Sequence, residues 1–138
     1  MTVEHPTPLA TKLGIVSGSV LITLKKPPEL ALELPPAVTV RTRLGGRADV
    51  IVAFANKSSE LTGRMERMAA AIFPSGGLWI AWPKKASKVP TDLSDHVVRD
   101  LAFPLGLVDN KVCSVDETWT ALRVVWRLEH RSARLVTP

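Results

Sequence analysis

Residues 48–85 read ADVIVAFANKSSELTGRMERMAAAIFPSGGLWIAWPKK, and this stretch decides the fold. Residues 49–55 are apolar after the first position, which is typical of a strand in the middle of a parallel sheet. Ser58 is placed to cap a helix. That helix has one apolar face, formed by Leu61, Met65, Met68, Ala69 and Ile72. Residues 75–77 (SGG) end the helix and residues 78–82 form a second strand, so the stretch predicts a βαβ unit with a right-handed crossover.

The residues before this unit predict two further strands. Residues 19–24 form a short apolar run between turn residues, as in a strand covered on both faces. The prolines that follow end this strand, and residues 29–34 are predicted to form a short helix with Pro28 in its first turn. Residues 37–43 alternate apolar and polar side chains, which indicates an edge strand with one wet face.

The residues after the unit predict a helix and a hairpin. Residues 83–90 (PKKASKVP) form a basic loop, and Thr91 is placed to cap the next helix. Residues 107–115 and 121–128 are two strands. The connection between them is short, which forces an antiparallel hairpin.

Chain length, cysteine content and net charge limit the number of domains, the compartment and the kind of partner. The chain has 138 residues, enough for one domain, which we place at residues 12–128 between flexible tails of residues 1–11 and 129–138. No apolar run approaches the ~20 residues of a membrane span, and the N-terminus does not read as a signal peptide. The single cysteine, Cys113, fits a reducing compartment, so we expect a cytoplasmic protein. The net charge of +5 favours anionic partners only mildly.

The order of the elements resembles that of Rossmann-like methyltransferases. Residues 74–77 (PSGG) resemble the glycine-rich stop between helix and strand in that family, and residues 13–18 (LGIVSG) resemble its lead-in. The resemblance implies a shortened α/β three-layer sandwich, with a mostly parallel sheet of five or six strands that ends in the antiparallel hairpin. It also implies a strand order with the first two strands on one side and the hairpin on the other.

The sequence departs from that family at the cofactor site. The family places a glycine-rich loop after its first strand and an acidic residue after its second. Here residues 25–28 (KKPP) and 41–43 (RTR) stand in those places. The histidines lack metal-ligand spacing, and Cys113 lies in a predicted strand with no histidine near it in sequence. The sequence therefore assigns no catalytic, cofactor-binding or metal-ligating residue, and no cofactor.

Three ordered motifs look similar to a family of small bacterial proteins, largely actinobacterial, described only as a domain of unknown function. The motifs are Trp82-Pro83-Lys84-Lys85-Ala86-Ser87, Leu105-Gly106-Leu107-Val108-Asp109 and Val115-Asp116-Glu117-Thr118-Trp119. This resemblance spans about residues 12–127. It implies a truncated Rossmann-like domain and brings no activity with it.

Basic residues follow the predicted parallel strands. In an open parallel sheet ligands bind beyond the carboxyl ends of the strands, and helix N-termini at that edge favour anions. The candidate anion- or partner-binding residues at this edge are Lys25, Lys26, Lys57, Trp82, Lys84, Lys85, Ser87, Asp116, Glu117 and Trp119. The plainer alternative is a solvated rim, in which surface ion pairs contribute under ~1 kcal/mol.

Two functions are consistent with such an edge. The first is a non-catalytic binding or regulatory module whose partner is a protein or an anionic ligand, either a nucleotide or an RNA backbone. The alternative is a degenerate methyltransferase-type enzyme that binds a nucleoside-like cofactor. The outer strand of the hairpin also suggests a homodimer, because an exposed strand edge can pair with another chain.

Overall fold

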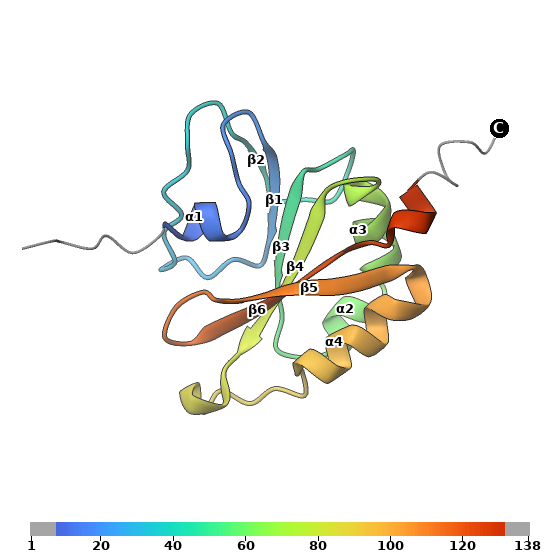
Figure 1. The fold of residues 1–138 in the computed structure, drawn as a ribbon. Helices are drawn as coiled ribbons and strands as arrows, with labels where there is room; N and C mark the ends of the chain where they lie inside the picture. Colours follow the sequence, from blue (N-terminus) through green and yellow to red (C-terminus); the bar gives the residue numbers. More distant parts are fainter. Residues whose placement is uncertain (1–7, 132–138) are drawn as a thin grey trace, which may run out of the picture.

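The computed structural model describes residues 8–131, which form a six-stranded sheet with helices on both faces (Figure 1). The strands are β1 (Val20–Leu24), β2 (Thr39–Arg41), β3 (Val50–Phe54), β4 (Gly77–Pro83), β5 (Leu107–Ser114) and β6 (Trp119–Trp126). Their order across the sheet is β2-β1-β3-β4-β6-β5. Strands β1 to β4 are parallel, and β6 is antiparallel to both of its neighbours, β4 and β5. The predicted mostly parallel sheet, terminal hairpin and strand order are confirmed.

The two faces of the sheet are covered unequally. The helices are α1 (Leu9–Lys12), α2 (Ser59–Thr62), α3 (Met65–Ile72) and α4 (Asp95–Ala102), with 3-10 turns η1 (Lys85–Ser87) and η2 (Phe103–Leu105). Helices α2, α3 and α4 pack on one face, which we call the helical face (Figure 1). The opposite face is covered by α1 and by the connection from β1 to β2, residues 25–38, and we call it the loop face.

The central βαβ unit has the burial that its composition predicts. Every residue of β3 and of β4 is buried, as expected for strands that are covered on both faces. The predicted stripe after β3 is also buried; its members are Leu61, Met65, Met68, Ala69 and Ile72. The apolar pattern therefore placed this part of the core correctly.

Two tryptophan side chains tie the cover of each face to the sheet. On the loop face, Trp79 of β4 donates from Nε1 to the carbonyl of Leu13 at 2.9 Å. On the helical face, Trp126 of β6 donates from Nε1 to the carbonyl of Ala69 at 2.8 Å. Both bonds are buried, and an unmet buried donor or acceptor costs roughly 1–3 kcal/mol. Each indole therefore contributes apolar area and a specific attachment point.

Residues 29–34 are not helical, and the prediction of a helix there is wrong. Leu30, Leu32 and Leu34 instead contact the loop-face core at every second position, as an extended chain does. Lys26 Nζ donates to the carbonyl of Leu30 at 2.6 Å, which takes an acceptor that a helix would use. Proline pairs on both sides leave a segment that is too short to nucleate a helix.

The predicted long helix after β3 is two helices. Gly63 and Arg64 separate α2 from α3, and glycine disfavours a helix interior by roughly 1 kcal/mol relative to alanine. Ser58 stands at the start of α2 without making a side-chain cap bond. Its hydroxyl donates to Asp92 at 2.9 Å, so it links α2 to the segment before α4.

The predicted cap of α4 is also wrong. The helix begins at Asp95, and the Ser94 hydroxyl accepts from the amide of Val97 at 3.2 Å. Thr91 lies outside the helix, where its hydroxyl donates to the carbonyl of Asn56. Because Thr91 contacts Asn56, the helix is capped by Ser94, the hydroxyl residue three positions later.

The packed part of the chain extends beyond the predicted limits of 12 and 128. Ala10 of α1 is buried, and residues 128–131 are helical. Arg131 Nε donates to the carbonyl of Trp126 at 3.0 Å. The remainder of the predicted tails, residues 1–7 and 132–138, lies outside the described residues. Across 8–131 no helix has both the length and the apolarity of a membrane span.

Replacing Trp79 with phenylalanine is expected to lower the free energy of unfolding by about 2–4 kcal/mol, because the Leu13 carbonyl loses its donor and buried volume is lost. Urea unfolding measures the change. Val112→Ala is the control: that side chain is 69% exposed, and the change is expected within about 0.5 kcal/mol. Equal values for the two variants would show that the indole bond contributes nothing measurable.

Candidate ligand-binding site

The loops after the parallel strands meet at one edge of the sheet. β1, β3 and β4 run in the same direction, and β5 runs with β4 because both are antiparallel to β6. Lys25, Asn56, Lys84 and Val115 directly follow, or lie within two residues of, the ends of these strands. We call this the carboxyl edge. The sequence placed the candidate residues at this edge correctly as to position.

Two of the predicted basic residues have bonds within the protein. Lys84 Nζ donates to the Ser114 hydroxyl and to the Asp116 carbonyl, both at 2.6 Å. Lys26 Nζ donates to the carbonyls of Pro27 and Leu30. Each ammonium fixes a loop and has fewer donors left for an external anion.

Three further predicted residues hold the edge in shape. The carboxylate of Asp116 accepts from the amides of Thr118 and Trp119 at 2.8 and 2.7 Å and so forms the hairpin turn. The Ser87 hydroxyl donates to the Lys84 carbonyl at 2.6 Å. Trp82 is buried in the helical-face core. The side chains of Asp116, Ser87 and Trp82 therefore stabilise this edge of the fold.

The remaining candidates divide into exposed charges and one ring. Lys57, Lys85 and Glu117 are exposed, and no hydrogen bond or ion pair joins their side chains to other described residues. Lys25 is exposed next to a hollow, and Trp119 lines the same hollow. The structure therefore brings only Lys25 and Trp119, of the predicted set, to a shared concave surface.

That hollow lies at the topological switch point of the sheet. The chain leaves β1 toward β2 on one side and returns past β1 to β3 on the other, so the two connections diverge between β1 and β3. The hollow has a volume of about 340 Å³, at the small end of the roughly 300–1,000 Å³ typical of ligand pockets. Its lining includes Lys25, Glu29, Phe54, Asn56, Glu60 and Trp119. Open α/β sheets bind ligands at this position.

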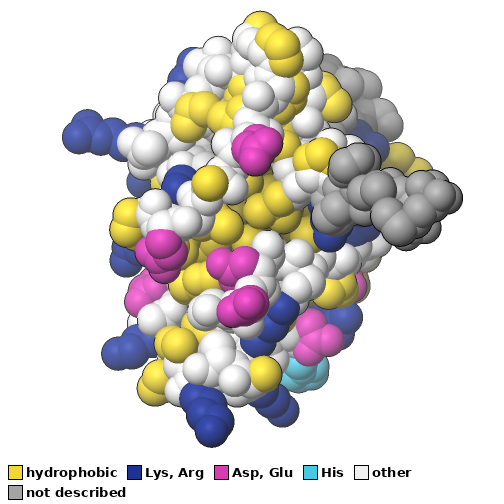
Figure 2. Space-filling view, turned by 90° about the vertical axis from the view of Figure 1, so that its left-hand side faces the viewer, with side chains coloured by type: hydrophobic (Ala, Val, Ile, Leu, Met, Phe, Trp, Pro, Cys, Tyr) yellow, Lys and Arg dark blue, Asp and Glu magenta, His cyan; other side chains and the backbone are white. Residues whose placement is uncertain are grey.

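Aromatic rings form one wall of the hollow. Phe54 ends β3, Trp119 begins β6, and their ring centroids are 5.2 Å apart at an interplanar angle of 85°. Phe54 is buried whereas Trp119 is half-buried, so the tryptophan offers the accessible ring. Figure 2 views the side of the molecule with the hairpin tip and residues 25–38. Hydrophobic side chains gather at its centre, with Asp, Glu, Lys and Arg side chains around them.

Backbone contacts hold the opposite wall in place. The amide of Asn56 donates to Glu60 Oε1 at 3.1 Å, and its carbonyl accepts from the Thr91 hydroxyl. Lys25 has φ of +57°, a left-handed conformation that turns the chain sharply after β1. Glycine usually takes such a position, and here the turn is made without one.

A second contact joins two loops of the carboxyl edge. Asp92 accepts from the amide and the hydroxyl of Ser58, at 2.7 and 2.9 Å. These hydrogen bonds, and to a smaller extent the charge of Lys57, hold the pKa of Asp92 below its usual value. The carboxylate therefore stays charged and keeps the start of α2 close to the segment before α4.

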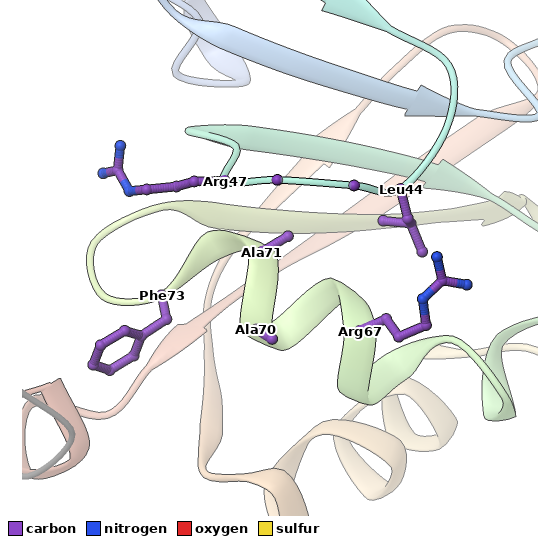
Figure 3. A pocket seen from close by; sticks show the side chains of 8 residues that line it. Leu44, Arg47, Arg67, Ala70, Ala71 and Phe73 are labelled. Carbon is purple, nitrogen blue, oxygen red and sulfur yellow. The ribbon is translucent and has the colours of Figure 1, made fainter. Parts of the chain in front are cut away.

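A larger hollow lies on the helical face and lacks these features. It has about 450 Å³ between residues 44–47 and α3, and its lining includes Leu44, Arg67 and Phe73 (Figure 3). Figure 3 shows Arg47 extending away from the space, while Arg67 lies beside Leu44. It is removed from the switch point, so position and chemistry both favour the hollow at the carboxyl edge.

The remaining reactive groups do not form a catalytic cluster in the described part of the chain. Cys113 is buried, and burial raises the pKa of its thiol, against weaker opposite effects of Lys12 and Lys84. Cys113 lies within β5, as the sequence predicts. Within residues 8–131 there is no group of three or more His, Cys, Asp and Glu side chains suited to a metal ion.

Four of the lining residues that sequence reasoning missed carry the chemistry of the hollow: Glu29, Phe54, Asn56 and Glu60. Glu29 fell in a helix that does not exist, and Phe54 was read only as part of a buried strand. Asn56 and Glu60 were not among the candidate residues. The available signal was positional: Phe54 and Asn56 end the strand next to β1, where the switch-point rule expects a ligand.

Comparison with solved structures gives the family of folds. A magnesium protoporphyrin IX methyltransferase from Synechocystis PCC 6803, with bound SAH, is similar with a TM-score of 0.57 and 13% identity over 86% of this chain and 80% of that one. A ribosomal protein L11 methylase from Lactobacillus delbrueckii subsp. bulgaricus gives 0.55 and 8%, over 86% and 77%. This chain has a methyltransferase-like Rossmann fold.

No family model matches the chain, and no curated protein matches its sequence. The resemblance of its motifs to the small bacterial family stays a prediction. At 8–13% identity the similarity of structure establishes the fold alone.

Lys84→Met is expected to lower the free energy of unfolding by about 1–2 kcal/mol, because two charge-assisted hydrogen bonds to the hairpin are lost at a half-buried position. Its neighbour gives the matched control, since Lys85→Met removes an exposed charge with an expected effect within about 0.5 kcal/mol. Chemical denaturation measures both. Equal stability of the two variants would contradict a structural role for Lys84.

Proposed function

We propose that this protein binds a nucleoside-like cofactor of the S-adenosylmethionine type, as a degenerate methyltransferase-type enzyme. The observation that carries the proposal is the hollow at the switch point between β1 and β3, with Trp119 and two carboxylates in its lining. Two solved methyltransferases share the fold, and one of them has bound SAH.

The lining suits the parts of a nucleoside. The half-buried ring of Trp119 provides an apolar surface for a base, and stacking on an aromatic ring contributes roughly 1–3 kcal/mol per base. Glu29 and Glu60 present carboxylates, which accept hydrogen bonds from ribose hydroxyls. The ammonium of Lys25 complements the carboxylate of an amino-acid tail. The volume of about 340 Å³ suits one nucleoside and its tail better than a dinucleotide.

The departures from the methyltransferase pattern are compensated at this hollow. The left-handed turn at Lys25 reverses the chain after β1, where the family uses glycines. The family's acidic residue after the second strand is replaced by Arg41, which is exposed. In this proposal Glu29 supplies the carboxylate from the preceding connection instead.

The bound cofactor would supply an activated methyl group. The residues of this chain would bind and orient it, and the apolar ring of Trp119 would exclude water from one side. Orientation alone is a large part of catalysis of group transfer, because it removes the entropy cost of bringing the reactants together. The exposed side chains of Lys57, Lys85 and Glu117 stand around the edge, where an acceptor would approach.

The non-catalytic module that depends on a basic edge has less support. Lys26 and Lys84, two members of the expected cationic set, donate to groups of the protein itself. The lining of the hollow has two carboxylates, Glu29 and Glu60, and one ammonium, Lys25. This chemistry suits hydroxyls and a ring better than a polyanion.

S-adenosylhomocysteine, S-adenosylmethionine and adenosine are expected to raise the melting temperature of the wild type by about 3 °C or more at saturation. Glu29→Gln is expected to weaken binding several-fold and Trp119→Leu at least ~10-fold, as loss of a hydrogen bond and of stacking requires. Calorimetric titration gives the affinities. Phe103→Leu, at a ring that is 57% exposed beyond α4, is the aromatic control and should bind as the wild type does.

The wild type failing to respond to any of the three compounds at millimolar concentration would overturn the proposal. Equal affinity for NAD and for the three compounds would point to a different ligand. Binding that the Trp119→Leu variant retains in full would point to a different surface.

A further inference from the structure

A second hollow lies at the opposite edge of the sheet, where the parallel strands begin. It has a volume of about 290 Å³ on the loop face, between residues 14–19 and the turn that leads into β4. Its lining includes Gly18, Asp49, Ser75, Gly76 and Arg123. None of its lining residues belongs to the hollow at the carboxyl edge, so the cofactor proposed above does not use it.

Arg123 is the unusual residue of this hollow. It lies on β6 and is half-buried, yet none of the carboxylates in residues 8–131 forms an ion pair with it. Its half-buried position partly removes the charge from water, and this burial lowers the pKa of the guanidinium. A charge that has lost water is normally compensated by a partner.

The neighbours of Arg123 add positive charge instead of neutralising it. Lys111 on β5 is its direct cross-strand partner, and like charges at opposed positions destabilise a sheet. Arg131 is also close enough for its charge to act on Arg123. The carboxylate of Asp49 is taken up elsewhere: it accepts from the amide of Val20 at 2.8 Å and pairs with Arg47 at 3.6 Å.

The backbone beside Arg123 leaves room for this arrangement. The guanidinium lies against Gly77, where a Cβ would come within 2.8 Å of Nη2 and 2.9 Å of Cζ. A side chain at position 77 would therefore displace the guanidinium from its place. The fold keeps a cation at the hollow by leaving this position without a side chain.

We propose that the hollow at the amino edge binds a phosphate group through Arg123, with the positive charges of Lys111 and Arg131 close to that residue. A phosphate carries about two negative charges at neutral pH and several acceptor oxygens. Its charge would compensate the guanidinium of Arg123, and its oxygens would accept hydrogen bonds from the N–H groups of that side chain. Arginine suits phosphate because its planar guanidinium donates two parallel hydrogen bonds. The hydroxyl of Ser75, which is exposed at the rim, is a further donor within the lining.

The test compares the melting temperature in inorganic phosphate with that in sodium chloride of equal ionic strength. Phosphate is expected to raise the melting temperature of the wild type by about 3 °C at ten to a hundred times its dissociation constant. Arg123→Gln is expected to abolish this rise. Without phosphate, R123Q should be at least as stable as the wild type, because an uncompensated charge has been removed.

A second variant keeps the charge and moves it. Gly77→Ala is expected to displace the guanidinium and to weaken phosphate binding about tenfold or more, while Arg123 remains. Arg64→Gln, at an exposed arginine before α3 on the other face, is the control and should respond to phosphate as the wild type does. A phosphate response that R123Q retains in full, or no response of the wild type, would overturn the proposal.

Two more ligands identify the source of the phosphate. Succinate of equal concentration should stabilise less than phosphate; an equal effect would overturn the assignment to phosphate in favour of any dianion. Adenosine monophosphate that binds tenfold more tightly than phosphate, and is lost in R123Q, supports the site with a nucleotide as its ligand. Binding of the nucleotide that survives in R123Q belongs to the carboxyl edge and counts against this site.

Discussion

The burial of β3 and β4 on both faces is the constraint on which the rest of the structure depends. Because these strands are apolar throughout, each face needs a cover that brings its own apolar surface. The crossover helices supply one cover, and α4 extends it. The other face has no long helix in the described residues, so short pieces from the first third of the chain cover it. The two buried indole bonds fix both covers to the sheet.

The same constraint explains how much of the fold the sequence predicts. Strong patterns, such as the run in β3 and the stripe from Leu61 to Ile72, report burial directly, and the elements they predicted are present. The strand order could be predicted only from the resemblance to methyltransferases, and it is confirmed. The helix expected at residues 29–34 was wrong because leucines at every second position are ambiguous when prolines enclose them. The cap of α4 depended on the contact of Thr91 with Asn56, which local sequence does not contain.

The sequence predicts the position of the candidate residues but not the contacts that their side chains make. Topology places a residue at an edge, so the sequence placed Lys25, Lys84 and Trp119 correctly. Whether an ammonium is free depends on which carbonyls lie nearby, and Lys84 is engaged by a hairpin thirty residues away in the chain. Glu29 enters the site because the connection after β1 is not helical, and Phe54 enters it because the last residue of β3 contacts Trp119 of the hairpin. Arg123 was not among the predicted residues, because its burial depends on packing against Gly77 of β4, which the local sequence does not show.

The unequal cover of the two faces has a consequence for motion. The connection of residues 25–38 packs on the sheet through apolar side chains such as Leu30. Its hydrogen bond from Lys26 to Leu30 is internal, and the Pro36 carbonyl accepts from Ser17, which precedes β1. The connection can detach without breaking any pairing between strands, so it is expected to open at a lower free energy than the sheet. This same connection carries Lys25 and Glu29, one wall of the hollow at the carboxyl edge. A ligand held there would favour the closed connection, and order on that face would rise and fall with occupancy.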